Sequence, residues 1–453
     1  MKNLHANKLS AVVLAALVAF SCSACGSSSG ASSNQAGGGS VAPASTESGG
    51  AKENTTITYI ASQGWVMDPE KALGKKFEEK TGIKVDYQIV PANQYSQVLL
   101  TKLNSGTCAD IFGGQSGKFD IVTQYNVEKN AADLSGEKWI STFDQSSRDE
   151  VSVNGKCYGL TIWDTAPLYP IMYNKKIFSD AGCTVPKTYA EFKADCDKIK
   201  GAGVTPIYES GADGWHMTLW FLDIGGVYEK GTPGLVDSLN ANKADFAGNK
   251  TMLTALNELL EMKKNGYFGS NFLSQSGSNT EQMMGSGKYA MVLAGLNEPA
   301  AVEKAVPAMK ADNFGFFEIP LADNQILGYS PCGPSKFIYS GSKHVQEAKE
   351  YFDFLTETDN LQYFLDNDPT KVSLCFSGVK DTMSAAAKEF VDSYQEKGIY
   401  LQNQVKYVNP QWGDIEKDLT SMYIGQMTPD QILQNIDKRR TEQAKAAKDS
   451  IWS

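Results

Sequence analysis

The sequence predicts an α/β fold, and three observations support this prediction. Between residues 55 and 112, β-rich segments alternate with segments of helical periodicity, which is the pattern of a parallel sheet covered by helices. The composition, with 42% hydrophobic and 21% charged residues, is that of a chain able to bury a core. The length of 453 residues predicts two or three domains.

The first three elements follow directly from local signals. Residues 55–61 alternate between apolar and polar side chains, which predicts a strand. Asp68 and Pro69 then open a helix, because Asp caps helices and Pro suits the first helical position. Gly82 ends this helix, and residues 84–90 form the second predicted strand.

A second helix over residues 94–104 and a third strand over residues 109–112 complete a β-α-β-α-β unit. Such a unit forms a parallel sheet, because each helix carries the chain back to the same edge. The later elements continue the alternation: we expect strands at 158–163, 168–173 and 288–293, and helices at 188–200, at 345–355 and after Thr428.

The N-terminus has the pattern of an export signal followed by a flexible tether. Lys2 and Lys8 precede ten apolar residues, 11–20, which are too few to cross a bilayer as a helix. Residues 1–24 are therefore predicted to be a lipoprotein signal peptide. The Ser/Gly-rich residues 25–53 are predicted to be a tether.

A cysteine at the end of this signal predicts a lipid anchor. Ser23, Ala24, Cys25 and Gly26 resemble a bacterial lipobox, in which small residues precede the cysteine that is lipidated. Cys25 is the better match, and Cys22 is the alternative site. We expect the mature protein on the outer face of the bacterial cytoplasmic membrane, with the lipid anchor as its only contact with the membrane.

Six further cysteines, an even number, permit disulfides in an exported chain. We expect one bridge, Cys183 to Cys196, because Cys183 lies in a loop just ahead of the helix that holds Cys196. The pairing of Cys108, Cys157, Cys332 and Cys375 is left open.

The charge balance restricts the partners. With 42 Lys and Arg against 52 Asp and Glu, the net charge is −10, which argues against nucleic acid as a partner. Only 3 His are present, and no C-x-x-C pair occurs among the six later cysteines, so we expect no metal and no cofactor. We expect a monomer.

Several motifs, in order, resemble one family. They are KALGKKFEEKTGIKVD (71–86), GTCADIF (106–112), NGKCYGL (154–160), MYNKKIF (172–178), KTYAEF (187–192) and GKYAMVLA (287–294). They resemble the extracellular solute-binding proteins of carbohydrate ABC transporters, the group that contains maltose-binding protein. The resemblance extends over about residues 55–440.

This resemblance implies a two-lobed periplasmic-binding-protein-like fold with a hinge and a cleft between the lobes. By analogy, lobe one comprises residues 54–163 and 288–342, and lobe two comprises residues 164–287 and 343–453. The implied function is to capture a sugar or oligosaccharide by lobe closure and to deliver it to the permease subunits of an ABC importer. The sugar is not identified by the sequence.

Sugars bind to aromatic rings through their C–H faces and to polar side chains through their hydroxyls. In open α/β sheets such ligands bind beyond the carboxyl ends of strands. We therefore expect ligand-binding residues in the loops that follow strands and in one late loop. They are Gln63, Trp65, Gly114, Gln115, Trp163, Asp164, Glu209, Trp215, His216, Gly295, Asn297 and Trp412.

The alternative function is a surface-tethered carbohydrate-active enzyme or adhesin. The one match to a G-x-S-x-G nucleophile motif, residues 26–30, lies in the tether without a strand before it. No P-loop or H-E-x-x-H motif occurs, and an adhesin would more naturally show repeats. We therefore expect a binding protein without enzymatic activity.

Overall fold

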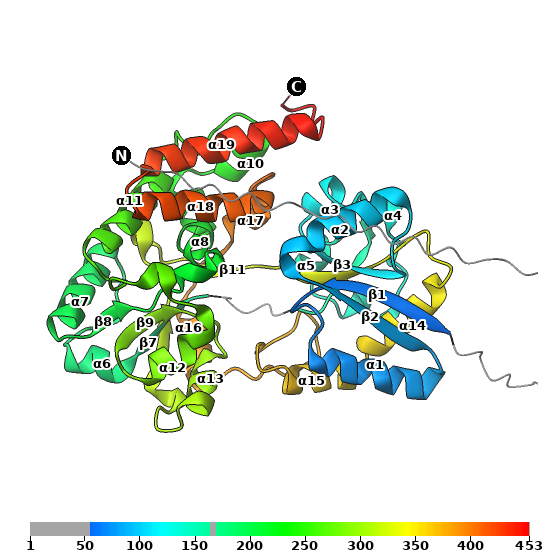
Figure 1. Ribbon diagram of the computed structural model, residues 1–453, viewed down its shortest axis with the longest axis horizontal. Helices are drawn as coiled ribbons and strands as arrows, with labels where there is room; N and C mark the ends of the chain where they lie inside the picture. The colour runs from blue at the N-terminus through cyan, green and yellow to red at the C-terminus, as the bar shows by residue number, and fades with distance from the viewer. Residues whose placement is uncertain (1–54, 164–168, 453) are drawn as a thin grey trace, which may run out of the picture. The chain divides into compact units, whose positions relative to one another are not determined.

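The computed structural model describes residues 55–163 and 169–452 (Figure 1). The predicted signal peptide, the tether with Cys22 and Cys25, and Asp164 lie outside these ranges. Within them, no helix combines the length and the apolar character that crossing a bilayer requires.

The first sheet has five strands in the order β2-β1-β3-β12-β6. β1, β2 and β3 are parallel, as the β-α-β-α-β pattern predicts, whereas β12 runs antiparallel to both of its neighbours. The strands are β1 (Thr56–Ser62), β2 (Lys84–Val90), β3 (Ile111–Gln115), β6 (Gly159–Thr161) and β12 (Pro334–Ile338).

Helices cover this sheet and share one hydrophobic core with it. Leu73 and Phe77 of α1, Leu99 of α2 and Tyr351 of α14 are all buried in this core. In Figure 1, α2 lies on the other side of the sheet from α1 and α15. The helices are α1 (Asp68–Thr81), α2 (Ala92–Ser105), α3 (Asp120–Thr123), α4 (Val127–Asn130), α5 (Gln145–Asp149), α14 (Val345–Leu355) and α15 (Thr358–Asn367).

The second sheet has four strands in the order β10-β7-β9-β8. Its side chains alternate between two cores, as the period of a strand requires: Ile171 and Met291 face one core, and Met172 and Val292 face the other. The strands are β7 (Ile171–Asn174), β8 (Thr205–Ile207), β9 (Tyr289–Leu293) and β10 (Phe314–Phe317).

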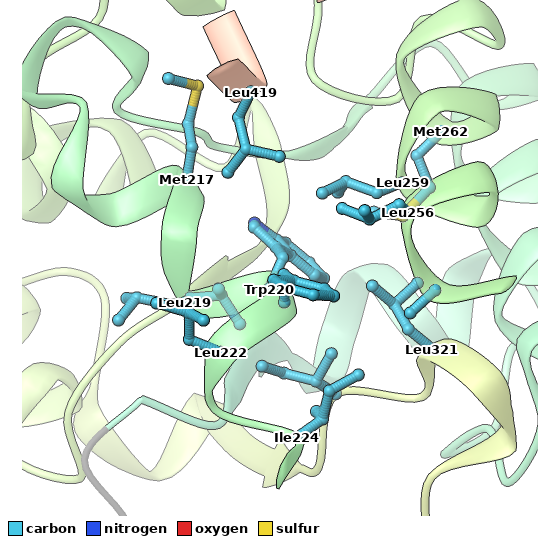
Figure 2. Close-up of a cluster of buried hydrophobic side chains, with 14 of the residues drawn as sticks. Met217, Leu219, Trp220, Leu222, Ile224, Leu256, Leu259, Met262, Leu321 and Leu419 are labelled. Atoms are coloured by element: carbon cyan, nitrogen blue, oxygen red, sulfur yellow. The ribbon is translucent and has the colours of Figure 1, made fainter. Parts of the chain in front are cut away.

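The larger of these two cores surrounds the Trp220 ring, which is fully buried (Figure 2). Leu256, Leu259 and Leu321 lie on one side of the indole, so Trp220 is part of this core. The helices beside the second sheet are α6 (Lys175–Asp180), α7 (Tyr189–Gly201), α8 (Trp215–Leu222), α9 (Gly225–Gly231), α10 (Leu235–Asn240), α11 (Lys250–Lys264), α12 (Thr280–Gly285), α13 (Glu298–Ala305), α16 (Ala385–Ser393), α17 (Leu401–Gln404), α18 (Trp412–Tyr423) and α19 (Pro429–Ala446).

Two small strand pairs complete the described chain. β4 (Ser152–Val153) and β5 (Lys156–Cys157) form a hairpin whose turn residues, Asn154 and Gly155, both have positive φ. β11 (Leu327–Tyr329) and β13 (Lys397–Ile399) pair in parallel.

Side-chain caps begin two of the predicted helices, whereas α1 has Met67 at its N-cap and no side-chain cap from Asp68. The Thr188 side chain accepts a hydrogen bond from the Glu191 backbone N–H at the start of α7. Thr428 and Gln431 form a full capping box at the start of α19.

The strand pairing corrects part of the expected lobe division. β9 and β10 both pair with β7, so the assignment of residues 288–342 to lobe one is wrong for residues 289–317. β9 is buried along most of its length, and its neighbours β7 and β8 belong to the second sheet. Conversely, α14 and α15 contribute to the first core, so the assignment of residues 343–367 to lobe two is also wrong.

The expected bridge between Cys183 and Cys196 is not formed, because both are free thiols in the structure. Cys196 is fully buried on the inner face of α7. The Cys183 Sγ instead donates to the Asp195 carbonyl oxygen at 3.7 Å.

Candidate functional site

A cavity of about 490 Å³ lies where several strands of the first sheet end, and residues near the second sheet line it as well. Ser62 ends β1 and Gln115 ends β3, while Pro334 begins the antiparallel strand β12 at the same edge. The lining residues are Ser62, Trp65, Tyr95, Ser96, Leu99, Gln115, Ser116, Gln124, Tyr125, Trp163, Tyr169, Trp215, Leu219, Asp223, Ser330, Cys332, Gly333, Pro334, Tyr400, Gln402, Asn403, Asn409, Pro410 and Trp412.

Trp65 and Tyr95 form an edge-to-face pair in this lining, with their ring centroids 5.1 Å apart. The Tyr95 hydroxyl donates to the Gly113 carbonyl oxygen at 2.5 Å, which ties α2 to the end of β3. A Cβ atom at Gly113 would lie 3.0 Å from the Trp65 ring. Gly113 thus leaves room for an aromatic side chain.

Trp163 follows β6 and is fixed on several sides. A Cβ atom at Gly333 would collide with its ring. The Lys371 Nζ lies 4.4 Å from the centroid of the same ring, a cation–π distance, and also 2.8 Å from the Asp368 carboxylate. Lys371 and Asp368 are both buried, so the ion pair with Asp368 fixes the position of the Lys371 ammonium group beside the Trp163 ring.

The opposite lining carries three more rings. Trp215, at the start of α8, is 38% exposed and packs edge-to-face on Tyr169 at 5.6 Å. Trp412 begins α18 and packs against the core of the second sheet. Rigid aromatic surfaces of this kind suit the C–H faces of a sugar ring.

Beside the cavity, a hydrogen bond joins an element packed on the first sheet to a segment packed on the second sheet. The Asn409 Nδ2 donates to the Asp120 Oδ2 at 2.9 Å. Burial raises the pKa of Asp120 to about 6, although the bond from Asn409 opposes this shift.

Of the twelve residues predicted to bind ligand, Trp65, Gln115, Trp163, Trp215 and Trp412 line the cavity. Asp164 lies outside the described residues. The other six lie elsewhere, for identifiable reasons.

Glu209 and His216 are buried behind Trp215 and bind each other. The His216 Nδ1 lies 2.7 Å from the Glu209 Oε1, and the Trp220 Nε1 donates to the Glu209 Oε2 at 2.7 Å. The carboxylate therefore has partners within the protein and is turned away from the cavity.

The remaining four residues do not line the cavity, and their places follow from backbone interactions or from the absence of a side chain. They are Gln63, Gly114, Gly295 and Asn297. Gln63 is exposed, with its N–H donating to the Val90 carbonyl oxygen. A Cβ atom at Gly114 would lie 2.8 Å from the Tyr125 ring, so Gly114 allows ring packing there. Gly295 and Asn297 form the turn into α13.

Sequence reasoning missed Tyr95, Tyr169, Asp223, Tyr400 and Gln402 in the lining. Asp223 carried a usable signal, because it is an acid directly after the apolar run of α8 and before Gly225. Gln402 carried none, because its position depends on long-range packing.

Comparison with known proteins establishes the family. Residues 63–362 match the model of the bacterial extracellular solute-binding proteins. The chain belongs to this family. The resemblance carried by the sequence motifs is thereby confirmed.

Curated relatives of this solute-binding protein include the multiple sugar-binding protein of Streptococcus mutans. It is 23% identical over 342 residues, which cover 73% of this chain and 77% of the relative. The diacetylchitobiose-binding protein DasA of Streptomyces coelicolor is 31% identical over 175 residues, which cover 36% of this chain and 39% of the relative.

Solved structures share the two-lobed fold. A Bacillus subtilis binding protein in an open conformation has a TM-score of 0.72 at 18% identity, over 87% of this chain and 99% of that chain. A Bacillus licheniformis sugar transporter protein in complex with stachyose has a TM-score of 0.69 at 16% identity, over 86% and 100%. The predicted two-lobed α/β fold is thus confirmed.

Proposed function

We propose that this chain is a lipid-anchored receptor that captures a sugar or oligosaccharide in its cleft and delivers it to an ABC importer. The observation that carries the proposal is the lining of the cavity, which combines aromatic rings with hydroxyl and amide groups. Trp65, Trp163, Trp215 and Trp412 supply indole surfaces from four separate segments of the chain. The names of the sugar-binding relatives agree with such a ligand.

The lining also favours binding over hydrolysis. A glycosidase uses a pair of carboxyl groups about 5–10 Å apart. Among the described residues that line the cavity, Asp223 is the single carboxyl group. His216 is engaged with Glu209 behind the lining and does not contribute a general base.

Lobe closure is the proposed basis of transport. A closed, liganded form would present the permease subunits with a surface that the open form lacks. We further propose that Cys25 carries the lipid, that the receptor is otherwise free of the membrane, and that it acts as a monomer at the outer face of the cytoplasmic membrane.

A thermal-shift screen against mono- and oligosaccharides tests the proposal, followed by calorimetry on each sugar that raises the melting temperature. Four tryptophans in the lining predict that a true ligand also changes the intrinsic fluorescence. Chromatography of the recovered sugar should show it unchanged. A cleaved product would identify an enzyme, and a screen without any stabilising sugar would contradict the receptor.

A further inference from the structure

Asp223 is a buried carboxyl group with an unused hydrogen-bonding oxygen. It follows α8 and is 2% exposed. Its Oδ1 accepts a hydrogen bond from the Gln402 Nε2 at 3.1 Å, but its Oδ2 has no partner among the described residues. Buried polar atoms in native proteins are bonded in the large majority of cases, so this oxygen calls for a partner.

Gln402 presents a second unused oxygen at the same place. Its Oε1 is buried and likewise has no partner among the described residues. Both side chains line the cavity. Two neighbouring oxygens without partners form a pair of acceptors for a ligand that brings two hydrogen-bond donors.

The local backbone builds this pair. A Cβ atom at Gly225 would lie 2.6 Å from the Leu401 backbone nitrogen and 2.7 Å from the Ile399 carbonyl oxygen. The absence of a side chain at Gly225 therefore lets the start of α9 approach the segment that carries Gln402. The same approach brings Gln402 to Asp223.

The charges around the pair restrict the ligand. The described residues that line the cavity include no Lys, Arg or His. His216, whose charge acts on Asp223, has acceptors at both ring nitrogens, the Glu209 carboxylate and the Leu293 carbonyl oxygen. Glu318, also buried, adds a further negative field at Asp223.

We propose that Asp223 and Gln402 form a subsite that binds adjacent hydroxyl groups of an uncharged sugar, and that this subsite makes the cleft select against sugars that carry a carboxylate. The inference rests on the proposed function and specifies its substrate class. A carboxylate placed here would lie beside two buried oxygens, and the described lining residues supply no cation to pair with it; burying an unpaired charge is costly. A hydroxyl pair supplies the missing donors at no such cost.

Calorimetry on the full chain tests the subsite with two sets of sugars. The neutral set is raffinose, stachyose, diacetylchitobiose and xylotriose, and the acidic set is trigalacturonate and xylotriose bearing a glucuronic acid branch. We expect at least one neutral sugar to bind. We expect the acidic sugars to bind at least ten-fold more weakly.

Asp223→Ala should weaken binding of the neutral sugar roughly ten-fold, because the sugar hydroxyl loses its hydrogen bond to the buried carboxyl group. Gln402→Leu should weaken it several-fold. Asp237→Asn is the matched control, because Asp237 is an exposed acid on α10 that does not line the cavity, and it should leave binding unchanged. Asp223→Asn keeps the shape of the side chain and should narrow the preference for neutral over acidic sugars.

The outcomes separate the two levels of the proposal. If the parent binds a neutral sugar and folded Asp223→Ala and Gln402→Leu both bind it within two-fold of the parent, the subsite is wrong while the receptor function stands. If Asp223→Ala does not fold, Asp223→Asn and Gln402→Leu decide the question in the same way. Tighter binding of the acidic sugars also overturns the inference, and a parent that binds no sugar overturns the receptor function together with it.

Discussion

Nδ1 of His216 lies 2.7 Å from the Glu209 carboxylate, and Nε2 of the same ring lies 2.9 Å from the Leu293 carbonyl oxygen. Both partners are acceptors, so both ring nitrogens donate and the buried imidazole carries a positive charge. This ion pair ties the start of α8 to the end of β9. It thereby holds Trp215, which packs on His216 at 5.4 Å and lines the cavity.

The ion pair predicts a pH-dependent contribution to stability. Burial by itself lowers the pKa of His216, but the Glu209 carboxylate outweighs it, and the net pKa is raised. The folded state therefore holds this proton more tightly than the unfolded state, whose histidine has a pKa of about 6.5. The contribution should be complete below that pH and should be lost as the pH rises through the folded pKa.

His216→Ala should lower the free energy of unfolding by about 3–5 kcal/mol at pH 6, because Glu209 is left buried without its cation. Urea titrations of parent and variant at pH 6 and pH 9 measure the difference, which should shrink at the higher pH. His344→Ala, which removes a more exposed histidine, should cost little at either pH. A difference that grows with pH would contradict the charged imidazole.

Trp163→Ala should weaken sugar binding roughly ten- to a hundred-fold, because a ring of the cavity lining is lost. Asp164→Asn should have an effect of similar size if the carboxylate accepts hydroxyl hydrogen bonds. Calorimetry with the sugar found in the screen provides the measurement. Parent-like affinity in both variants would show that these residues have no part in binding.

Gly333→Ala should displace the Trp163 ring, since the added Cβ atom has no room beside it. We expect a loss of about 1–3 kcal/mol in stability from overpacking, with weaker sugar binding. Gly413→Ala is the matched control, because a Cβ atom there meets nothing within 4 Å. Thermal melts and calorimetry on both variants test the contrast, and equal behaviour would refute it.

Lys371→Met should destabilise the protein by about 3–5 kcal/mol, because it leaves the buried Asp368 carboxylate without its cation. It also removes the cation from the Trp163 ring and should shift the tryptophan emission. Lys380→Met, at an exposed position in the same segment, should change neither the stability nor the tryptophan emission. Unfolding curves followed by fluorescence would detect both effects, and an unchanged midpoint would rule out a structural ion pair.

Cys25→Ser should abolish membrane retention and signal processing. The reason is chemical, since the lipidation proposed for Cys25 requires a thiol at this position. Fractionation of cells and mass spectrometry of the mature N-terminus measure the result, with Cys22→Ser as the parallel variant. A mature N-terminus at another residue without a diacylglycerol group would refute the anchor.

Much of the fold could be predicted from local signals. The first three strands, the helices between them and the caps at Thr188 and Thr428 depend on residues close in the sequence. The lobe division was predicted less well. β9 was correctly predicted to be a short buried strand. The sheet that it joins, however, is determined by its pairing with β7, a segment over a hundred residues away.

The site shows the same limit. A tryptophan in a loop after a strand is recognisable, and Trp65, Trp163 and Trp215 do line the cavity. Glu209 and His216 also come after a strand, but they point into the protein because they form a hydrogen bond with each other. Sequence position places a side chain near the cleft, whereas its hydrogen-bond partners decide which way it faces.

The position of β12 has a consequence for the order in which the protein assembles. β12 is the strand between β3 and β6, yet it comes from residues 334–338, long after both of its neighbours have been synthesised. A nascent or truncated chain that ends before it exposes two unpaired strand edges, which are templates for aggregation. All four strands of the second sheet are available by residue 317, so that sheet can pair while the first is still open. Fragments that end before residue 338 are therefore poor substitutes for an isolated first lobe, and the edge stays unfinished until residue 338 of the 453 has been synthesised.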